Sequence, residues 1–220
     1  MRTFDTPAPI SAILDIPASL VRIIAADRAD TAVEVLPVDA AKGRDVKLAE
    51  QTTVEYGDGV LRIVASAKNQ ILGSSGSVEV TVRLPAGSRI EVKADSAELR
   101  GVGRFGDVTF EGSHGDMKVD EAASVRVTTQ AGDVSVGRLT GPAEISVAKG
   151  DIRIAEAVRG TVVLRTQAGD VSVGAAAGVS AALDAGTSHG RTHNALKNTG
   201  RTDLTIRATT DHGDIAAYSL

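Results

Sequence analysis

Two histidines near the C-terminus occupy equivalent places in a repeated motif, each directly before a glycine at a predicted bend. They are His189 and His212, and an amide and an acid, Asn194 and Asp214, follow them within five residues. Two imidazoles and a carboxylate can bind zinc or exchange protons with a substrate. The candidate catalytic residues are therefore His189, His212, Asp214 and Asn194. The alternative is an exposed turn position without chemistry, since alanine and lysine fill the same place in other repeats.

The segment GRTHNALKNTGR (190–201) departs from the repeat pattern. It places Thr192 and Asn194 where the alignment of repeats requires inward-facing apolar residues. Buried amides need hydrogen-bond partners. Two interpretations stay open: a bulge or polar pocket near the C-terminal end, or a terminal loop in which Asn194 donates to backbone carbonyls.

A Gly-Asp pair followed by an apolar residue recurs along the second half of the chain and provides a second candidate site. It occurs at 106–108, 115–117, 132–134, 150–152, 169–171 and 213–215. If the repeats stack, the acids form a ladder along one edge, in which Asp133, Asp151 and Asp170 are candidate calcium ligands. Without a metal, each Asp would accept hydrogen bonds from N–H groups of its own turn. The spacing of calcium-binding nonapeptide repeats occurs only between Gly106 and Gly115.

Two further motifs match the residue pattern of enzyme fingerprints, but the secondary structure predicted around them does not fit. GVGRFG (101–106) fits G-x-G-x-x-G, and GTSHG (186–190) fits G-x-S-x-G. The first fingerprint requires a following helix, and the second requires a strand-to-helix turn in an α/β sheet. The surrounding residues predict strands and turns instead. We therefore expect no bound cofactor and no serine hydrolase site.

The candidate residues lie in a chain built from repeats of about 18 residues. The nonapeptide TQAGDVSVG occurs at 129–137 and again at 166–174, and the bend glycines from Gly115 onward are 17, 18, 19, 21 and 23 residues apart. Apolar and polar residues alternate around each bend, which is typical of strands with one buried face. We expect each repeat to form one coil that stacks on the preceding coil, with Val134, Ile152 and Val171 in one inward column.

Residues 1–96 follow a different pattern of longer strands. Strands are expected in TFDTPAPISAILDI, SLVRIIAAD, TAVEVLPV and SVEVTVRLPAGSRIEVKA, with a helix at 42–51, a hairpin within 52–66 and a loop at 68–77. We expect residues 1–96 to cap, and to be continuous with, a solenoid formed by residues 97–220. The predicted fold class is all-β: a short right-handed parallel β-solenoid (β-helix) with a strand-rich N-terminal cap.

Composition excludes several classes of function. The chain carries 24 Lys and Arg against 28 Asp and Glu, and aromatic residues make up 2% of it. Without a basic stripe or stacking aromatics, nucleic-acid binding is not expected. Cysteine is absent, so thiolate chemistry is excluded. MRTFDTPAPISAILDI does not fit a signal peptide, and no run approaches the roughly 18 apolar residues of a membrane span. We therefore expect a cytoplasmic protein without membrane contact.

Several segments together resemble a known bacterial family. They are FDTPAPIS, AEQTTVEYGDGVLRI, GSVEVTVRLPAGS, the Gly-Asp repeats and TIRATTDHGDIAAY. The chain resembles the β-strand-repeat family, common in actinobacteria, that is called a domain of unknown function or "putative adhesin". The resemblance covers nearly the whole length, and it implies a right-handed β-solenoid and no defined activity.

Three hypotheses for the function follow. The first is a non-enzymatic cytoplasmic scaffold or protein-interaction module, with a homodimer formed through one end or face of the solenoid, because open strand edges pair readily. The second is a small-molecule-binding protein or enzyme, with a site near the C-terminal coils or in the groove between cap and solenoid. The third, ranked lowest, is a surface adhesin.

Overall fold

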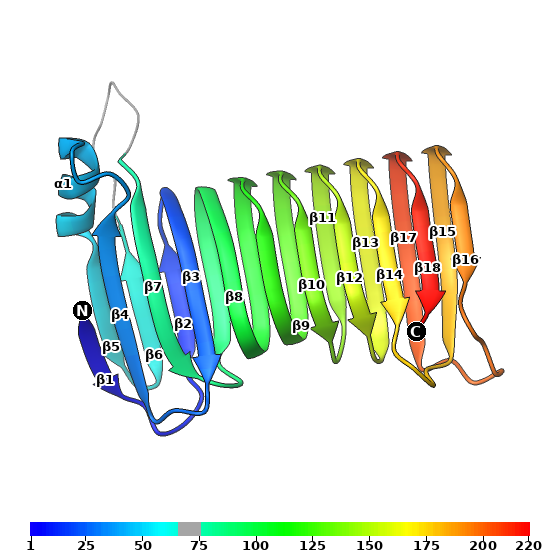
Figure 1. The fold of residues 1–220 in the computed structure, drawn as a ribbon, viewed down its shortest axis with the longest axis horizontal. Helices are drawn as coiled ribbons and strands as arrows, with labels where there is room; N and C mark the ends of the chain where they lie inside the picture. Colours follow the sequence, from blue (N-terminus) through cyan, green and yellow to red (C-terminus); the bar gives the residue numbers. More distant parts are fainter. Residues whose placement is uncertain (66–75) are drawn as a thin grey trace. The chain divides into compact units, whose positions relative to one another are not determined.

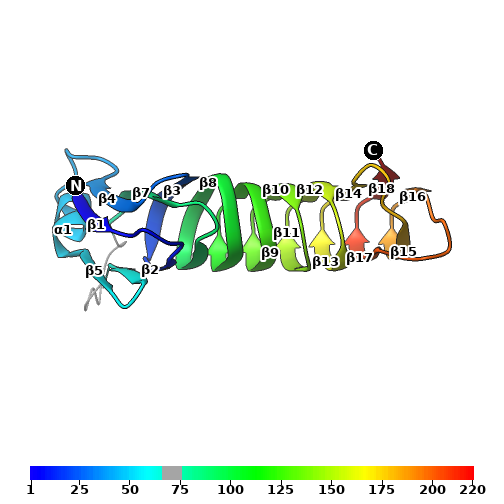
Figure 2. The ribbon, with the colours of Figure 1, turned by 90° about the horizontal axis from the view of Figure 1, so that it is seen from below.

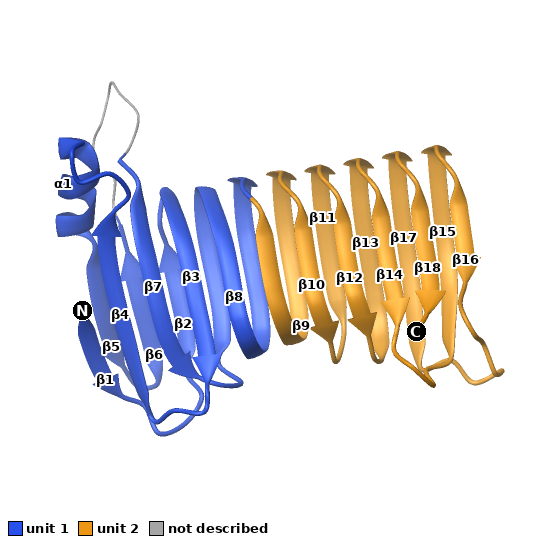
Figure 3. Cartoon of the chain, viewed as in Figure 1, with its two compact units in different colours: residues 1–115 blue, residues 116–220 orange. Residues whose placement is uncertain are grey.

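The fold is all-β. The computed structural model describes residues 1–65 and 76–220, with 69% of the chain in strands and 4% in helix (Figure 1). The chain divides into two compact units, Met1–Gly115 and Asp116–Leu220, which Figure 3 shows in blue and orange. The predicted division into a cap over 1–96 and a solenoid over 97–220 stays a prediction, since a compact unit is defined by contacts and not by a capping role.

In unit 2, the strands from Met117 to Ala175 stack coil on coil in sequence order. They are β9 (Met117–Ala131), β10 (Val134–Leu139), β11 (Ala143–Lys149), β12 (Ile152–Ala157), β13 (Gly160–Ala168) and β14 (Val171–Ala175). β10 pairs in parallel with β9 and β12, and β11 pairs in parallel with β9 and β13. Figure 2 shows β10, β12 and β14 along one side of the unit and β11 and β13 along the other.

The predicted inward columns are confirmed in this part of unit 2. Val134 is the register partner of Ile152, and Ile152 is the register partner of Val171. All three side chains are at most 1% exposed. Each pair in a column removes apolar surface from water, at about 25 cal/mol per Å². The alternation of apolar and polar residues therefore fixes which face of each strand forms the core.

The last two coils do not follow sequence order. They consist of β15 (Ala181–His189) with β16 (Thr192–Ala195), and of β17 (Leu204–His212) with β18 (Ile215–Ser219). β17 pairs in parallel with both β13 and β15, and β18 pairs with both β14 and β16. The C-terminal coil, red in Figure 1, thus lies between two earlier coils. The prediction that every coil stacks on the preceding one is wrong here.

Burial explains this exchange of order. The inward residues of the C-terminal coil are apolar, and Ile206 and Ile215 are at most 1% exposed. The coil formed by β15 and β16 instead carries Thr192 and Asn194 at inward positions, and both are exposed. An inner coil is covered on both sides, and burying an amide without a partner there costs free energy. The apolar coil therefore takes the inner place and the polar coil the outermost one.

The bends between the two rows of strands depend on glycine. Gly169 has φ 153° and Gly213 has φ 151°, in the region that favours glycine. A Cβ built on Gly169 would clash with the carbonyl oxygen of Gly150 in the preceding coil. The Gly-Asp pair at 106 was predicted to be a bend of the same kind, which is wrong: Gly106 lies inside strand β8 (Arg89–His114) and is not among the positive-φ residues.

Threonine hydroxyls bond the carbonyls of glycines at two of these bends. Thr166 donates to the carbonyl oxygen of Gly150 at 3.0 Å, and Thr210 donates to that of Gly169 at 3.0 Å. Both threonines are at most 5% exposed. A buried hydroxyl needs such a partner. Thr166 and Thr210 thus each link one coil to the bend glycine of a neighbouring coil.

Unit 1 mixes parallel and antiparallel pairing. Its elements are β1 (Arg2–Asp5), β2 (Ser11–Asp15), β3 (Ala18–Ala26), β4 (Asp30–Pro37), α1 (Gly43–Gln51), β5 (Thr53–Gly57), β6 (Val60–Val64), β7 (Val78–Pro85) and β8. β2 and β3 pair in parallel with β8, while β1 and β7 pair antiparallel with β4.

The local predictions for unit 1 are confirmed where the structure describes them. The helix expected at 42–51 is α1, and the hairpin expected within 52–66 is the antiparallel pair β5–β6. Its turn residues Asp58 and Gly59 have φ of 52° and 74°, as a tight hairpin turn requires. Of the loop expected at 68–77, residues 68–75 lie outside the described residues.

The exchanged order of coils predicts which cysteine pairs will form a disulfide. Arg165 is the register partner of Thr209, and Thr209 is the partner of Gly186. The Arg165→Cys/Thr209→Cys variant should oxidise readily because adjacent strands lie about 4.8 Å apart. The Arg165→Cys/Gly186→Cys variant should not, because two strand spacings exceed disulfide reach. Peptide mapping by mass spectrometry measures both, and the reverse result would show sequential stacking.

The bend glycines predict a large loss of stability on a small substitution. Gly169→Ala should lower the free energy of unfolding by about 3 kcal/mol or more, through the backbone clash and the disfavoured φ. Gly186→Ala is the matched control, because a Cβ there meets nothing within 4 Å. It should change stability by less than about 1 kcal/mol. Urea denaturation of both variants measures the difference, and equal effects would refute the close approach.

Candidate functional site

The two candidate histidines face each other on neighbouring strands. His189 of β15 is the register partner of His212 of β17, and their ring centroids are 4.6 Å apart with planes inclined by 14°. The predicted stacking in adjacent coils is therefore confirmed, and both side chains are exposed. Stacked rings hold their nitrogen lone pairs in parallel planes, so one ring would have to rotate before both could bind one ion. A catalytic role for the pair stays a prediction.

Asp214 is held by an arginine from the adjacent coil. Its Oδ1 accepts the backbone N–H of Arg191 at 2.8 Å, and its Oδ2 accepts Nη2 at 2.7 Å and Nε at 3.2 Å. The Arg191 side-chain hydrogen bonds, followed by its backbone hydrogen bond, lower the pKa of Asp214, and the same pair raises the pKa of Arg191. A carboxylate in this state accepts a proton poorly near neutral pH.

Asn194 lies apart from the histidine pair. It belongs to β16, in the other row of strands, where its register partner is Ala217. Its Oδ1 accepts the backbone N–H of Leu196 at 3.0 Å, and the side chain is exposed. The prediction that Asn194 donates to backbone carbonyls is therefore wrong, because the amide oxygen acts as the acceptor at the end of the short strand. The structure does not bring Asn194 together with His189.

The aspartates of the bends form a continuous ladder of hydrogen bonds between coils. The Oδ1 atom of Asp133 accepts the backbone N–H of Asp151 at 2.9 Å, and that of Asp151 accepts the N–H of Asp170 at 2.8 Å. Asp170 in turn accepts the N–H of Asp214 at 2.7 Å. The ladder of aspartates was predicted. The prediction that each carboxylate accepts N–H groups of its own turn is wrong, because the parallel register places the N–H of the adjacent coil over each carboxylate.

The candidate metal ligands Asp133, Asp151 and Asp170 thus each use one carboxylate oxygen in the ladder. Within residues 1–65 and 76–220, no group of three or more His, Asp or Glu side chains has a geometry that could hold a metal ion. Calcium binding at these residues stays a prediction. Among the same residues, no helix is long and apolar enough to cross a membrane.

Sequence reasoning did not assign a role to Arg191. It occupies the place that aspartate holds in the other repeats, and its side chain pairs with the last carboxylate of the ladder. The signal was present as Gly190-Arg191 in the Gly-Asp position. The order of coils was needed to interpret it, because Arg191 follows Asp170 in sequence but contacts Asp214 in space.

A comparison of sequences identifies a family. The family model described as Toastrack DUF4097 matches residues 14–218. None of the curated proteins matches the chain.

Solved structures with a similar fold share little sequence with this chain. A "putative adhesin" from Bacteroides fragilis NCTC 9343 has a TM-score of 0.53 and 13% identity, over 98% of this chain and 95% of that chain. A "putative adhesin" and a "putative lipid binding protein" from Parabacteroides distasonis ATCC 8503 have TM-scores of 0.49 and 0.48, with 15% and 12% identity. Each covers 98% of this chain and 95% of its own. At 13% identity the likeness to the Bacteroides fragilis structure shows the fold alone.

The pairing of Arg191 with Asp214 predicts a pH-dependent contribution to stability. Because the folded-state pKa of Asp214 is lowered, the pair stabilises the fold above the unfolded-state pKa and ceases to do so as pH falls through the folded-state value. Arg191→Gln should therefore lower the free energy of unfolding at neutral pH. The difference in the free energy of unfolding between this variant and the wild type should shrink as the pH falls below 3.8, the ordinary pKa of Asp.

Urea denaturation between neutral pH and the acid limit of folding measures this difference. The matched control is Arg153→Gln, which removes an exposed arginine on the outer face of β12. Its effect should not follow the titration of Asp214. A pH-independent difference for Arg191→Gln would contradict the assigned role of the ion pair.

Proposed function

Because this chain belongs to the Toastrack DUF4097 family, a domain of unknown function, we propose a role drawn from its own geometry: a non-enzymatic cytoplasmic scaffold that binds a partner through its outermost coil. The proposal treats the chain as a right-handed parallel β-solenoid whose N-terminal residues cap one end. The stacked parallel pairs of unit 2 support the solenoid part of this description.

One observation carries the proposal. Among the described residues, β15 pairs only with β17 and β16 pairs only with β18, so the outer edges of β15 and β16 keep unpaired backbone groups. Lys197 and Asn198 bond the backbone of Ala181, which leaves the rest of β15 open. This stretch contains one charged residue before His189, Asp184, and no proline. Such an edge is a template for another strand.

The side chains at this edge also favour a partner. Leu183 and Ala185 continue the inward columns of unit 2 but are only half-buried, since no described coil covers them. A strand added to β15 would cover both side chains and pair the free N–H and C=O groups. Backbone pairing would supply affinity, and the alternating side chains would supply register.

We propose a second copy of the chain as the partner. A two-fold axis through the centres of β15 and β16 places each strand antiparallel to its own copy, which is an isologous interface. With Ala185 on the axis, Asp184 lies opposite Gly186 of the second copy, so no two acids face each other. The edge is therefore complementary to itself in charge.

The interface is tested with two substitutions at one position. Gly186 has room for a side chain, because a Cβ there meets nothing within 4 Å. Gly186→Asp places a second acid opposite Asp184 and should shift the dimer towards monomer, while Gly186→Lys should preserve or strengthen it. Native mass spectrometry and sedimentation equilibrium measure the subunit number. A monomeric wild type, or equal behaviour of the two variants, would exclude this interface.

A second candidate function rests on the stacked His189 and His212 pair, 4.6 Å apart. Exposed imidazoles in register on two strands are suited to acid–base chemistry or to holding a small molecule near the C-terminal coils. The same native mass spectra distinguish the two functions. If the native protein carries an excess mass from a bound ligand and the His189→Ala/His212→Ala variant loses it, this site is favoured. If the protein is a scaffold, both substitutions should leave its subunit number unchanged.

Adhesion is the third candidate. It is supported by the Bacteroides fragilis structure, described as a "putative adhesin", which shares the fold at 13% identity. Cell fractionation separates it from the scaffold: a cytoplasmic scaffold remains with the soluble cell contents, and an adhesin is recovered from the cell wall or the medium.

A further inference from the structure

The C-terminal coil, formed by β17 and β18, is inserted between two coils that are in register with each other. Ala208 of β17 is the register partner of Leu164 in β13 on one side and of Ala185 in β15 on the other. β18 has the same relation to β14 and β16. If the C-terminal coil were absent, the outermost coil, formed by β15 and β16, would meet β13 and β14 with the same side chains facing inward, because no residue slip separates them.

The bends of the C-terminal coil and of the outermost coil make the same contacts. Thr210 donates its hydroxyl to the carbonyl oxygen of Gly169 at 3.0 Å, and Thr187 of the outermost coil donates to that of Gly213 at 2.9 Å. A Cβ built on Gly213 would clash with the carbonyl oxygen of Gly169, and one built on Gly190 would clash with that of Gly213. The outermost coil therefore has the residues to contact Gly169 in the way that the C-terminal coil now does.

Arg191 ends the aspartate ladder whether or not the C-terminal coil is in place. The N–H of Asp214 donates to Oδ1 of Asp170 at 2.7 Å, and the N–H of Arg191 donates to Oδ1 of Asp214 at 2.8 Å. Without the C-terminal coil, the N–H of Arg191 would stand over Asp170, and the guanidinium would pair with the carboxylate of Asp170 in place of that of Asp214. The ladder would be shorter by one step and still complete.

The connections on either side of the outermost coil allow it to move. Residues 176–180 join β14 to β15 across two strand spacings, about 9.6 Å, whereas residues 158–159 join β12 to β13, which belong to adjacent coils. A connection that reaches the second coil also reaches the first. On the other side, residues 196–203 are exposed except for Leu196, which is half-buried. The C-terminal coil is therefore tethered by a surface segment and can leave as a unit.

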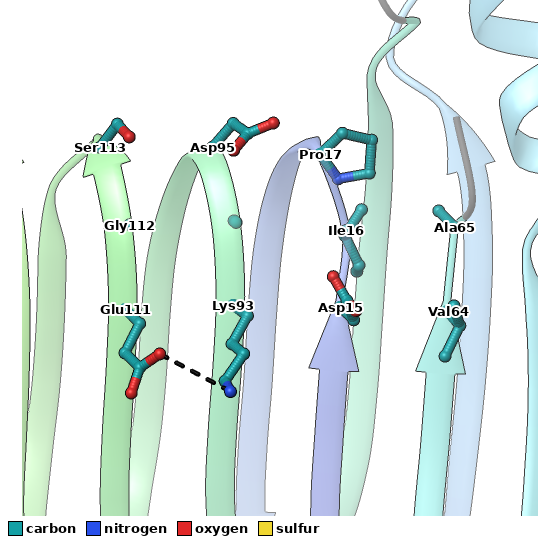
Figure 4. A pocket seen from close by; sticks show the side chains of 11 residues that line it. Asp15, Ile16, Pro17, Val64, Ala65, Lys93, Asp95, Glu111, Gly112 and Ser113 are labelled. Carbon is teal, nitrogen blue, oxygen red and sulfur yellow. Dashed lines mark ion pairs between the residues drawn. The ribbon is translucent and has the colours of Figure 1, made fainter. Parts of the chain in front are cut away.

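The bends of unit 1 are not interchangeable in this way. The neighbouring bends in Figure 4 have different residues, at 15–17, 93–95 and 111–113. Side chains connect two of these coils, with Lys93 Nζ 3.7 Å from Glu111 Oε2, and the bends leave a groove of about 480 Å³. A coil of unit 1 could not replace its neighbour without losing contacts of this kind, so coil replacement is a property of the repeated Gly-Asp bends.

We propose that the C-terminal coil is a releasable insert, and that the outermost coil closes on β13 and β14 when it leaves. The inserted arrangement is the resting one, because Ile206 and Ile215 fill inward positions where the outermost coil has Leu183 and Thr192. Release frees residues 204–220 from the solenoid without leaving an open apolar gap. β15 remains the outermost strand in both arrangements, so this inference does not depend on the proposed dimer.

A cysteine pair in the full chain tests the release. Arg165→Cys/Gly186→Cys reports closure, because these positions are two strand spacings apart in the resting arrangement and one, about 4.8 Å, after closure. Adding Ile206→Asp/Ile215→Asp makes insertion unfavourable, since unpaired carboxylates are costly to bury. The yield of the intramolecular disulfide should then rise about tenfold, because the two sulfurs come within bonding reach only after closure. Peptide mapping by mass spectrometry measures the yield.

The matched control is Thr205→Asp/Ala216→Asp in the same cysteine background. It adds the same charge to the same two strands at outward-facing positions, and the disulfide yield should remain at the background level. Ser146→Cys/Arg165→Cys is a second reporter, because these residues are register partners in β11 and β13. This disulfide should form in the presence of the two inward-facing acids, since the remaining coils stay stacked.

Three results would overturn the proposal. The first is an Arg165→Cys/Gly186→Cys pair that remains reduced with the inward-facing acids in place, and the second is an equal yield in the control. The third is loss of the second reporter's disulfide, which would show that release unfolds the neighbouring coils instead of letting the outermost coil close on them.

Discussion

Adjacent coils of unit 2 come so close at their bends that a side chain does not fit between them, and the register of the unit depends on this contact. The N–H of Gly169 donates to the carbonyl of His212, and the N–H of Gly213 donates to that of His189. Aspartate carboxylates bridge the same coils one residue later. Because this backbone contact recurs at Gly132, Gly150, Gly169 and Gly213, it aligns the strands on both sides of these bends, and the inward columns follow.

The same contact limits which coil can be outermost. An aspartate in the ladder donates its N–H to one neighbour and accepts from the other, as Asp214 does between Asp170 and Arg191. Arg191 can donate its N–H but has no carboxylate to accept the next one. A coil with arginine in this place therefore ends the ladder. The exposed Thr192 and Asn194 of that coil agree with this position, so burial and hydrogen bonding select the same order.

The sequence predicted the features that arise within one repeat or between like repeats. Val134 and Ile152 pair because their alternation fixes the inward face, and His189 meets His212 because the motif gives them the same register. The order of the last coils was not predictable from this pattern, because the register is the same for either order. Gly106 lies within β8 although its Gly-Asp-Val tripeptide matches those at the bends, because the identity of three residues does not determine the backbone angle φ.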